Sequence, residues 1–279
     1  MNPRNFLSEI VAQKRRTVAK LRADSTVGAL RARAVEIRKN AAPHRLREML
    51  DAPSPELKII AEFKRASPSI GAIRGDLSPA DVARHYERGG ACAISVLTDK
   101  EYFGGSIDDL CAVRSSTHLP VLRKDFIVDP IQIYEAAIAG ADAILLIVAA
   151  LDDDSLGELC KVAEDEFALD ALIEVHTSDE LHRALNVGAK IIGVNNRNLQ
   201  TFEVSVSTSE RLIAKAPRDR LMLSESGLRD PEQLRDLHAL GFRGFLIGEA
   251  LMRAKNPEGA LRDLLAHAGD RQIVSHRTS

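Results

Sequence analysis

The sequence predicts a (β/α)8 barrel of the TIM type, preceded by an N-terminal helical extension. From Leu57 onward, eight short apolar runs rich in β-forming residues alternate with stretches that carry helix start and stop signals. Eight strand–helix pairs over roughly 210 residues fit a closed barrel better than an open doubly wound sheet. No G-x-G-x-x-G motif follows the first run, which removes the main support for a dinucleotide-binding sheet.

The strands are predicted from the apolar runs in chain order. They cover residues 58–63, 92–97, 119–123, 142–148, 169–175, 190–194, 220–223 and 244–247.

The helices between the strands are predicted from their caps. Ser78, Asp129 and Asp230 each precede a proline, which places a capping side chain before a residue suited to the first helical position. Thr177 with Glu180 three residues later has the capping-box pattern.

Glycines that close helices have a recurring spacing. Gly90, Gly140, Gly188 and Gly241 each stand just before a predicted strand, and successive members are 50, 48 and 53 residues apart. Such positions favour a left-handed residue that ends a helix. The spacing corresponds to about two strand–helix units per step, which is weak periodicity rather than a sequence repeat.

Residues 1–50 are predicted to form the helical extension, residues 51–270 the barrel and residues 271–279 a polar tail. The extension holds twelve lysines and arginines against four acids, a net charge of +8 in a chain of net charge −2. It lacks the apolar core of a secretory signal and the interleaved aromatic residues expected of an RNA-stacking surface. Apolar residues recur in it at helical spacing and favour an amphipathic helix packed on the barrel: Phe6, Leu7, Ile10, Val11, Val18 and Leu21.

The composition is that of an ordinary globular protein. The 279 residues are 45% hydrophobic and 28% charged, which excludes collagenous, low-complexity and wholly disordered chains. The longest apolar stretch, residues 143–151, is too short to span a bilayer. Three cysteines without C-x-x-C spacing argue against a disulfide framework and favour a cytoplasmic location.

Ionisable and polar residues follow several of the predicted strands. In a (β/α)8 barrel the catalytic groups lie at the carboxyl ends of the strands. Burying so many ionisable groups without a task would cost stability, so together they predict an active site. The residues in question are Glu62, Lys64, Lys124, Glu174, Asn195, Arg197 and Glu225.

Glycines after the last two strands predict a phosphate site. Ser226 and Gly227 follow the seventh strand, and Gly248 and Glu249 follow the eighth, where many barrels bind phosphate. Glycine allows backbone N–H groups to approach an anion, and a short helix after the last strand would point its N-terminus at that anion. A small phosphorylated substrate is therefore expected.

Other kinds of site are not predicted. The histidines lack ligand spacing and no acidic metal cluster is evident, so no metal is expected. We interpret His85, His118, His176 and His182 as structural or surface residues. The segment around Ser67 lacks the G-x-S-x-G context of a nucleophile elbow.

The motifs at the strand ends resemble those of the indole-3-glycerol phosphate synthase family, in order and over nearly the whole chain. The most specific segments are 62–69 (EFKRASPS), 97–106 (LTDKEYFGGS), 124–127 (KDFI), 172–175 (LIEV), 195–199 (NNRNL) and 225–227 (ESG). The N-terminal Ile10, Val11 and Lys14 pattern belongs to the same resemblance.

The resemblance implies a carbon–carbon lyase of tryptophan biosynthesis. It would close 1-(2-carboxyphenylamino)-1-deoxyribulose 5-phosphate to indole-3-glycerol phosphate, with release of CO2 and water. By this resemblance Lys124 is the general acid and Glu174 the second acid/base residue. Glu62 would hold Lys124 charged and oriented, and Lys64 would pair with the substrate carboxylate.

The resemblance assigns the remaining roles as follows. Asn195 would hydrogen-bond a sugar hydroxyl, Arg197 would hold the anionic substrate, and Glu225 would complete the polar network. Phe103 and Phe126 would flank the anthranilate ring. The other substrate-binding positions are Ser67, Ser226, Gly227, Gly248 and Glu249.

One position departs from the family pattern. Glu249 stands where the family often has serine, and a carboxylate pointing inward would repel a phosphate.

The chemistry implied needs no cofactor. Ring closure makes the carboxylate-bearing carbon sp³, so loss of CO2 restores aromaticity without an electron sink such as pyridoxal phosphate.

Two alternatives stay open from the residues alone, because barrels host many chemistries. One is a sugar-phosphate isomerase or epimerase, and the other is a non-catalytic barrel that binds a phosphorylated ligand. We expect no nucleic-acid or membrane partner. The family's single-function members suggest a monomer, with other tryptophan-pathway enzymes as candidate partners.

Overall fold

The computed structural model describes residues 6–68, 71–74, 77–199 and 201–269. The predicted tail, residues 271–279, and Ser69 of the 62–69 motif lie outside the described residues.

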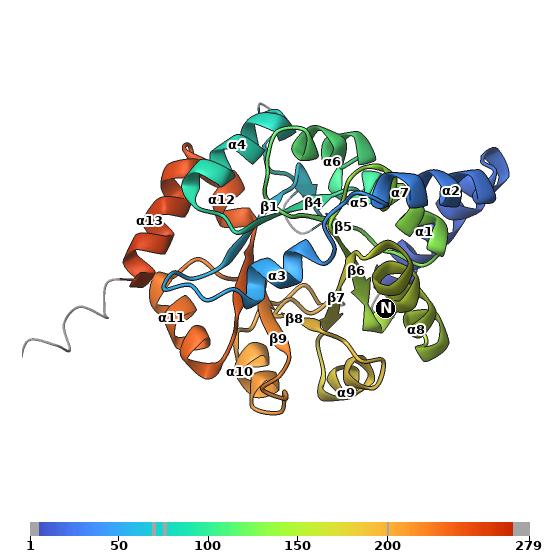
Figure 1. The fold of residues 1–279 in the computed structure, drawn as a ribbon. Helices are drawn as coiled ribbons and strands as arrows, with labels where there is room; N and C mark the ends of the chain where they lie inside the picture. Colours follow the sequence, from blue (N-terminus) through green and yellow to red (C-terminus); the bar gives the residue numbers. More distant parts are fainter. Residues whose placement is uncertain (1–5, 69–70, 75–76, 200, 270–279) are drawn as a thin grey trace, which may run out of the picture.

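Eight parallel strands close into a barrel, as predicted (Figure 1). In chain order they are β1 (Ile59–Phe63), β4 (Ala93–Leu97), β5 (Val121–Lys124), β6 (Ala143–Ile147), β7 (Asp170–Val175), β8 (Ile191–Asn195), β9 (Leu221–Glu225) and β10 (Gly244–Ile247). The barrel closes where β1 pairs with β10, with Ile60 opposite Leu246. The predicted runs match these strands to within two residues at every end, because β-forming residues stop where the loops begin.

Helices form the outer ring (Figure 1). They are α4 (Pro79–Gly89), α5 (Lys100–Phe103), α6 (Ile107–Arg114), α7 (Pro130–Ile138), α8 (Asp153–Lys161), α9 (Ser178–Asn186), α10 (Ser207–Ile213), α11 (Pro231–Leu240), α12 (Glu249–Arg253) and α13 (Pro257–Gly269). A two-stranded hairpin, β2 (Ala66–Ser67) with β3 (Gly71–Ala72), follows β1.

The predicted helix caps are present. Ser78, Asp129, Thr177 and Asp230 each accept a hydrogen bond from a backbone N–H of the first turn that follows. The four glycines before strands have positive φ, from 81° at Gly188 to 120° at Gly241, so they end helices as expected.

The extension forms three helices instead of one, because breaks at Ser25–Thr26 and near Pro43 divide it. They are α1 (Phe6–Asp24), α2 (Val27–Arg38) and α3 (Arg45–Asp51). α3 lies across one end of the barrel (Figure 1), where Leu46 and Leu50 pack on the interior side chains. Arg45 and Arg47 of α3 pair with Asp142 and Asp170 at the start of two strands. α3 therefore closes the end of the barrel opposite the predicted active site.

The barrel interior is apolar along most of its length. Successive strand residues alternate between the interior and the helix layer. Ile60, Leu122, Leu172, Leu223 and Leu246 belong to one buried cluster inside the barrel. Their strand neighbours pack outward in a second cluster beneath the helices. The polar residues at the carboxyl ends of the strands lie directly above this apolar interior.

In the part of the chain that the structure describes, no helix is long and apolar enough to cross a membrane. Cys92, Cys111 and Cys160 are free thiols.

Candidate active site

The strand period places the polar side chains above the apolar interior. Glu62, Lys124, Glu174 and Glu225 each stand two residues beyond an interior aliphatic residue of the same strand, so they point the same way. Their strands are in register at this level, with Leu97 opposite Lys124 and Asn195 opposite Glu225. Residues scattered over more than 160 positions thus meet at one end of the barrel.

Two adjoining cavities occupy this end. The inner one has a volume of about 120 Å³ and the outer one about 490 Å³. Every predicted site residue lines one or both of them except Glu225, which is 1% exposed and lies beneath Lys124. The residues shared by both cavities are Glu62, Lys64, Lys124, Arg197, Ser226 and Glu249.

Lys124 is held between two carboxylates. Its Nζ donates a hydrogen bond to Glu225 Oε2 and lies 3.6 Å from Glu174 Oε2. Burial alone would lower the pKa of Lys124, but the carboxylates of Glu225, Glu174 and Glu62 outweigh it and raise that pKa. Lys124 is therefore an ammonium ion at neutral pH, with a proton to donate.

The buried position of Glu225 changes the pKa of its carboxyl group. Burial raises the pKa of Glu225 to about 7, against the opposing attraction of Lys124, and the nearby Glu174 and Glu62 carboxylates add to the rise. The carboxyl group fits only because Gly193 has no side chain, since a Cβ there would lie 2.0 Å from Glu225 Oε1. This role of Gly193 could not be predicted from the sequence.

Glu62 contacts Lys64 instead of Lys124. Lys64 Nζ donates a hydrogen bond of 2.8 Å to Glu62 Oε1. Burial would raise the pKa of Glu62, but Lys64 and Lys124 together lower it, so Glu62 is ionised. Glu62 does not contact Lys124 as expected, but its charge helps to raise the pKa of Lys124. The carboxylates that lie beside Lys124 are those of Glu225 and Glu174.

Asn195 orients Glu174. Its Nδ2 donates a 3.1 Å hydrogen bond to Glu174 Oε1, and its Oδ1 accepts one of 3.0 Å from the Arg197 backbone N–H. Asn195 is 8% exposed and lines the inner cavity. The amide thus links the second acid/base candidate to the loop that carries Arg197.

Phe103 and Phe126 form one wall of the inner cavity. Their ring centroids are 6.3 Å apart with planes inclined at 34°. An aromatic ring placed between two others needs about 7 Å or more, twice a carbon–carbon contact distance. In this structure the two rings therefore contact each other and offer one common surface, in place of the two flanking surfaces expected.

The loops after β9 and β10 have distinctive backbone geometry. Ser226 and Gly227 have φ values of 67° and 75°, and α12 begins directly after Gly248. A Cβ on Gly227 would lie 2.4 Å from Val204 Cγ1, and one on Gly248 would lie 2.3 Å from Glu62 Oε1. Gly248 is therefore needed for the packing of Glu62 as well as for an open approach to the backbone.

Glu249 is directed toward two arginines. Its carboxylate oxygens lie 3.8 Å from Arg197 Nη2 and 3.9 Å from Arg253 Nε, and its side chain is 36% exposed. Both arginines line the outer cavity. The carboxylate thus partly offsets the positive charge of two arginines that line the outer cavity.

Known proteins resemble this chain along most of its length. The family model described as indole-3-glycerol phosphate synthase matches residues 7–264. Proteins named indole-3-glycerol phosphate synthase from Polaromonas sp. (strain JS666) and Delftia acidovorans are each 49% identical to it, over 78% and 75% of this chain and 82% and 79% of their own. The chain belongs to the indole-3-glycerol phosphate synthase family.

A more distant likeness concerns the fold alone. The solved structure of thiamine phosphate pyrophosphorylase from Pyrococcus furiosus superposes with a TM-score of 0.57 at 15% identity, over 80% of this chain and 97% of that one. It is a second protein with the same barrel architecture and carries no information about the reaction of this indole-3-glycerol phosphate synthase family member.

Helix α1 also lines the site, which was not predicted from the sequence. Phe6, Leu7 and Ile10 line the inner cavity. Phe6 packs edge-on against Tyr102 and Phe202, with ring centroids 5.3 and 4.9 Å away. Their helical spacing was visible in the sequence, but it indicated packing on the barrel and not which end of the barrel the helix covers.

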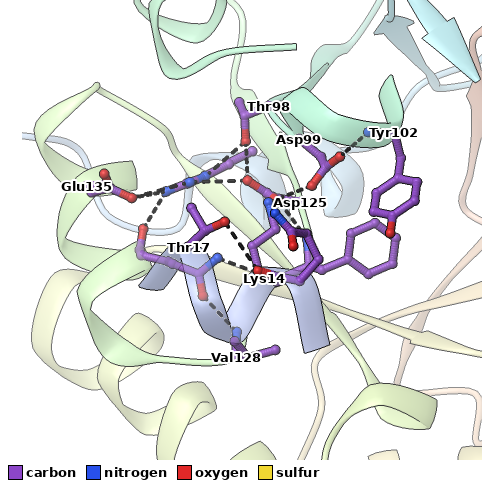
Figure 2. Close-up of polar contacts among 12 residues, drawn as sticks. Lys14, Thr17, Thr98, Asp99, Tyr102, Asp125, Val128 and Glu135 are labelled. Carbon is purple, nitrogen blue, oxygen red and sulfur yellow. Dashed lines mark hydrogen bonds and ion pairs between the residues drawn. The ribbon is translucent and has the colours of Figure 1, made fainter. Parts of the chain in front are cut away.

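Lys14 fastens α1 to the mouth (Figure 2). Its Nζ lies 2.7 Å from Asp99 Oδ2 and 2.7 Å from Asp125 Oδ1, and the residue is 8% exposed. Asp99 also caps α5 through the Tyr102 N–H, and Asp125 directly follows Lys124. Lys14 therefore joins α1 to the loops after β4 and β5.

Arg123 adds a second buried cation to this polar cluster, and it is 5% exposed. It contacts Asp125 Oδ2 at 3.2 Å and Thr98 Oγ1 at 3.1 Å, and donates to the Gln132 carbonyl at 2.6 Å. The carboxylate of Asp125 is thus held by two cations, Lys14 and Arg123.

Within the described ranges, no group of three or more histidine, cysteine or acidic side chains is arranged to hold a metal ion.

Proposed function

We propose that this chain closes 1-(2-carboxyphenylamino)-1-deoxyribulose 5-phosphate to indole-3-glycerol phosphate, as its family's name indicates. The observation that carries the proposal is the pairing of the Lys124 ammonium with the Glu174 carboxylate, 3.6 Å apart in one buried mouth. A proton donor and a proton acceptor that face the same cavity are what a ring closure followed by a dehydration requires. The reaction belongs to tryptophan biosynthesis.

The first step joins the aryl ring to the ketone carbon. The ring carbon that bears the carboxylate attacks the ketone carbon, and Lys124 donates a proton to the ketone oxygen as it becomes a hydroxyl. The carboxylate then leaves as CO2, and its bonding electrons restore the aromatic ring. Lys64 beside Glu62 lines the same cavity and is placed to hold the substrate carboxylate until it leaves.

The second step is a dehydration. The new hydroxyl takes a proton from an ammonium donor and leaves as water, while Glu174 removes a proton from the neighbouring C1 carbon to form the indole double bond. Asn195 orients Glu174 for this proton transfer. Its side chain donates a hydrogen bond to Glu174 Oε1, so that Oε2 lies on the side of Lys124. The Phe103 and Phe126 wall supplies apolar contact for the aromatic ring.

Phosphate would bind in the outer cavity. The Ser226–Gly227 backbone, the start of α12 and the side chains of Arg197 and Arg253 line it. A phosphorylated end in the outer cavity and an aromatic end in the inner one fit the two ends of the proposed substrate.

Turnover is the direct test of the function. The purified chain is mixed with the carboxyphenylamino substrate, without added cofactor or metal, and indole fluorescence is followed; the chain has no tryptophan, so background emission is low. A rising signal supports the lyase. Well-folded protein that binds the substrate without converting it would instead identify a binding barrel.

Replacing Glu249 by serine is expected to strengthen substrate binding. The change removes a negative charge from the outer cavity and releases Arg197 and Arg253 for the phosphate. We expect KM to fall by roughly threefold to tenfold at low ionic strength, as expected for one charge near a partly exposed site, with kcat little changed. Glu258→Ser, which removes a carboxylate from α13, is the control. A KM that rises in Glu249→Ser would show that Glu249 organises the cavity.

We further propose that the chain works in the cytoplasm as a monomer. Three free thiols, two of them largely covered, support a reducing compartment. Light scattering during gel filtration tests the oligomeric state, and a stable dimer would contradict it. Association with other tryptophan-pathway enzymes would be seen as a shift in that elution when they are added.

A further inference from the structure

His176 stands directly behind Glu174, on the side away from the substrate cavity. Its Nε2 lies 3.5 Å from Glu174 Oε1, and among the described residues this buried atom has no hydrogen-bond partner. Its Nδ1 lies 3.2 Å from Glu180 Oε2. The ring therefore bridges two carboxylates, one of them the proposed base.

The Glu180 carboxylate contacts His176 and not the backbone N–H that the capping-box pattern predicts. The capping box predicts that its carboxylate accepts from the Thr177 backbone N–H. It accepts instead from the backbone N–H of His176, at 2.8 Å, and from the ring. Thr177 still caps α9 through the Glu180 N–H. The carboxylate of Glu180 thus holds the imidazole at its Nδ1 side.

A separate cavity reaches His176 from outside. It has a volume of about 460 Å³ and lies next to the inner cavity, with Leu7, Asn195 and Leu199 forming the wall that both share. Its polar lining includes His176, Glu180, Asn196, Thr208 and Arg211. A chamber of this size with polar walls has room for several water molecules.

The proposed reaction requires a proton from solvent. At neutral pH the substrate carboxylate leaves as neutral CO2, and the ketone oxygen leaves as water with two added protons. Only one proton is released by the substrate, from C1 to Glu174. One further proton must therefore enter from solvent in each turnover to recharge the ammonium donors.

We propose that His176 relays this solvent proton from the separate 460 Å³ cavity to Glu174, which passes it to Lys124. The inference rests on the proposed function and adds a positioning residue to it. His176 accepts a proton at Nδ1, beside Glu180, and donates the Nε2 proton to Glu174 Oε1, 3.5 Å away; a change of tautomer then returns the ring to its starting form. Glu174 Oε2 faces Lys124 Nζ. The path can therefore work while substrate fills the mouth.

The charged groups around His176 favour this role. Burial would lower the pKa of His176, but Glu180, Glu174 and Glu225 outweigh it and raise that pKa above its ordinary value. Lys124 lies on the far side of Glu174, and Arg211 and Glu203 line the chamber. The imidazole thus keeps its proton further into the neutral range than an isolated histidine would.

His176→Gln tests the relay, because glutamine keeps hydrogen-bonding capacity but cannot carry a proton. With wild-type turnover established first, we expect kcat to fall about tenfold or more, with KM changed less than about twofold. The decline of wild-type kcat as pH rises through the pKa of His176 should disappear in this variant. Added imidazole should restore part of the rate.

Two further variants separate the relay from a structural role. His182→Gln changes an exposed histidine of α9 and should behave as wild type. Glu180→Gln removes a carboxylate that raises the pKa of His176, so the decline of kcat should begin at lower pH, a shift that loss of packing would not cause. This variant also serves if His176→Gln does not fold.

The outcomes are distinct. A wild type without turnover contradicts the proposed function. A wild type with turnover, together with a His176→Gln variant that keeps its kcat and pH profile, contradicts the relay alone. A lower rate without any change in pH profile and without imidazole rescue also overturns it, because only packing would then be lost.

Discussion

Lys124→Met is expected to lose turnover by a factor of about 10³ or more, because it removes the ammonium that protonates the ketone oxygen. It is also expected to destabilise the barrel, and by more at high pH than at low pH. Lys124 is the cation that contacts both Glu225 and Glu174, which are 1% and 2% exposed. Removing one partner of a buried ion pair typically costs about 3–5 kcal/mol.

The direction of the pH dependence follows from Glu225. Its folded-state pKa is raised to about 7 even beside Lys124, and without that cation it rises further. A carboxyl group whose pKa is raised on folding stabilises the fold fully below its unfolded pKa and loses that contribution as pH rises through the folded value. The variant should therefore approach wild-type stability near pH 5 and fall furthest behind it above pH 7.

Urea unfolding at several pH values measures this effect, with turnover assayed in parallel. Lys161→Met, on the exposed face of α8, is the control and should leave both quantities unchanged. Turnover in Lys124→Met within about tenfold of wild type would remove Lys124 from the role of general acid. A stability deficit that is the same at every pH would show that Glu225 and Glu174 do not depend on it.

Lys14→Met is expected to detach α1 from the mouth. The substitution leaves Asp99 and Asp125 without the cation that joins them, at a typical cost of about 3–5 kcal/mol for a broken buried pair. Burial would lower the pKa of Lys14, but Asp125 and Asp99 outweigh it, so the charge is present in the fold. KM should rise about tenfold or more, because Phe6, Leu7 and Ile10 leave the cavity wall.

Arg22→Met provides a matched control on the same helix. Arg22 pairs with Asp129 at 2.9 Å, but its side chain is 49% exposed, and such surface pairs contribute only about 0–1 kcal/mol. Hydrogen exchange of the α1 amides should accelerate in Lys14→Met and stay near wild type in Arg22→Met. Equal KM values in all three proteins would mean that α1 does not form the substrate cavity.

The fold could be predicted because its signals are local. Each strand is marked by its own apolar run and each helix by its own cap, and Ser78, Asp129 and Asp230 act as caps in the structure as expected. The period of two residues then predicts which strand-end side chains point inward. Lys124, Glu174 and Asn195 could be placed in one mouth on that ground alone.

The partners within the mouth could not be predicted in the same way. Glu62 and Lys64 are adjacent on one strand face, yet nothing in the sequence says that they bind each other while Lys124 turns to Glu225, which is 101 residues away. Such choices depend on side-chain reach across the barrel. Lys14 is a similar case, since its two partners lie on loops of different strands.

Because β1 pairs with β10, the outer cavity is lined by residues from the first and the last strands of the barrel. Glu62 lies near the end of the first barrel strand and Lys64 follows it, while Gly248 and Glu249 follow the last strand, and all four line the same cavity. A chain emerging from the ribosome can present Lys124 and Glu174 well before it has any complete place for a phosphate. Substrate recognition in this cavity therefore has to wait until β10 has been made, and a nascent fragment that stops short of β10 lacks the last wall of the cavity.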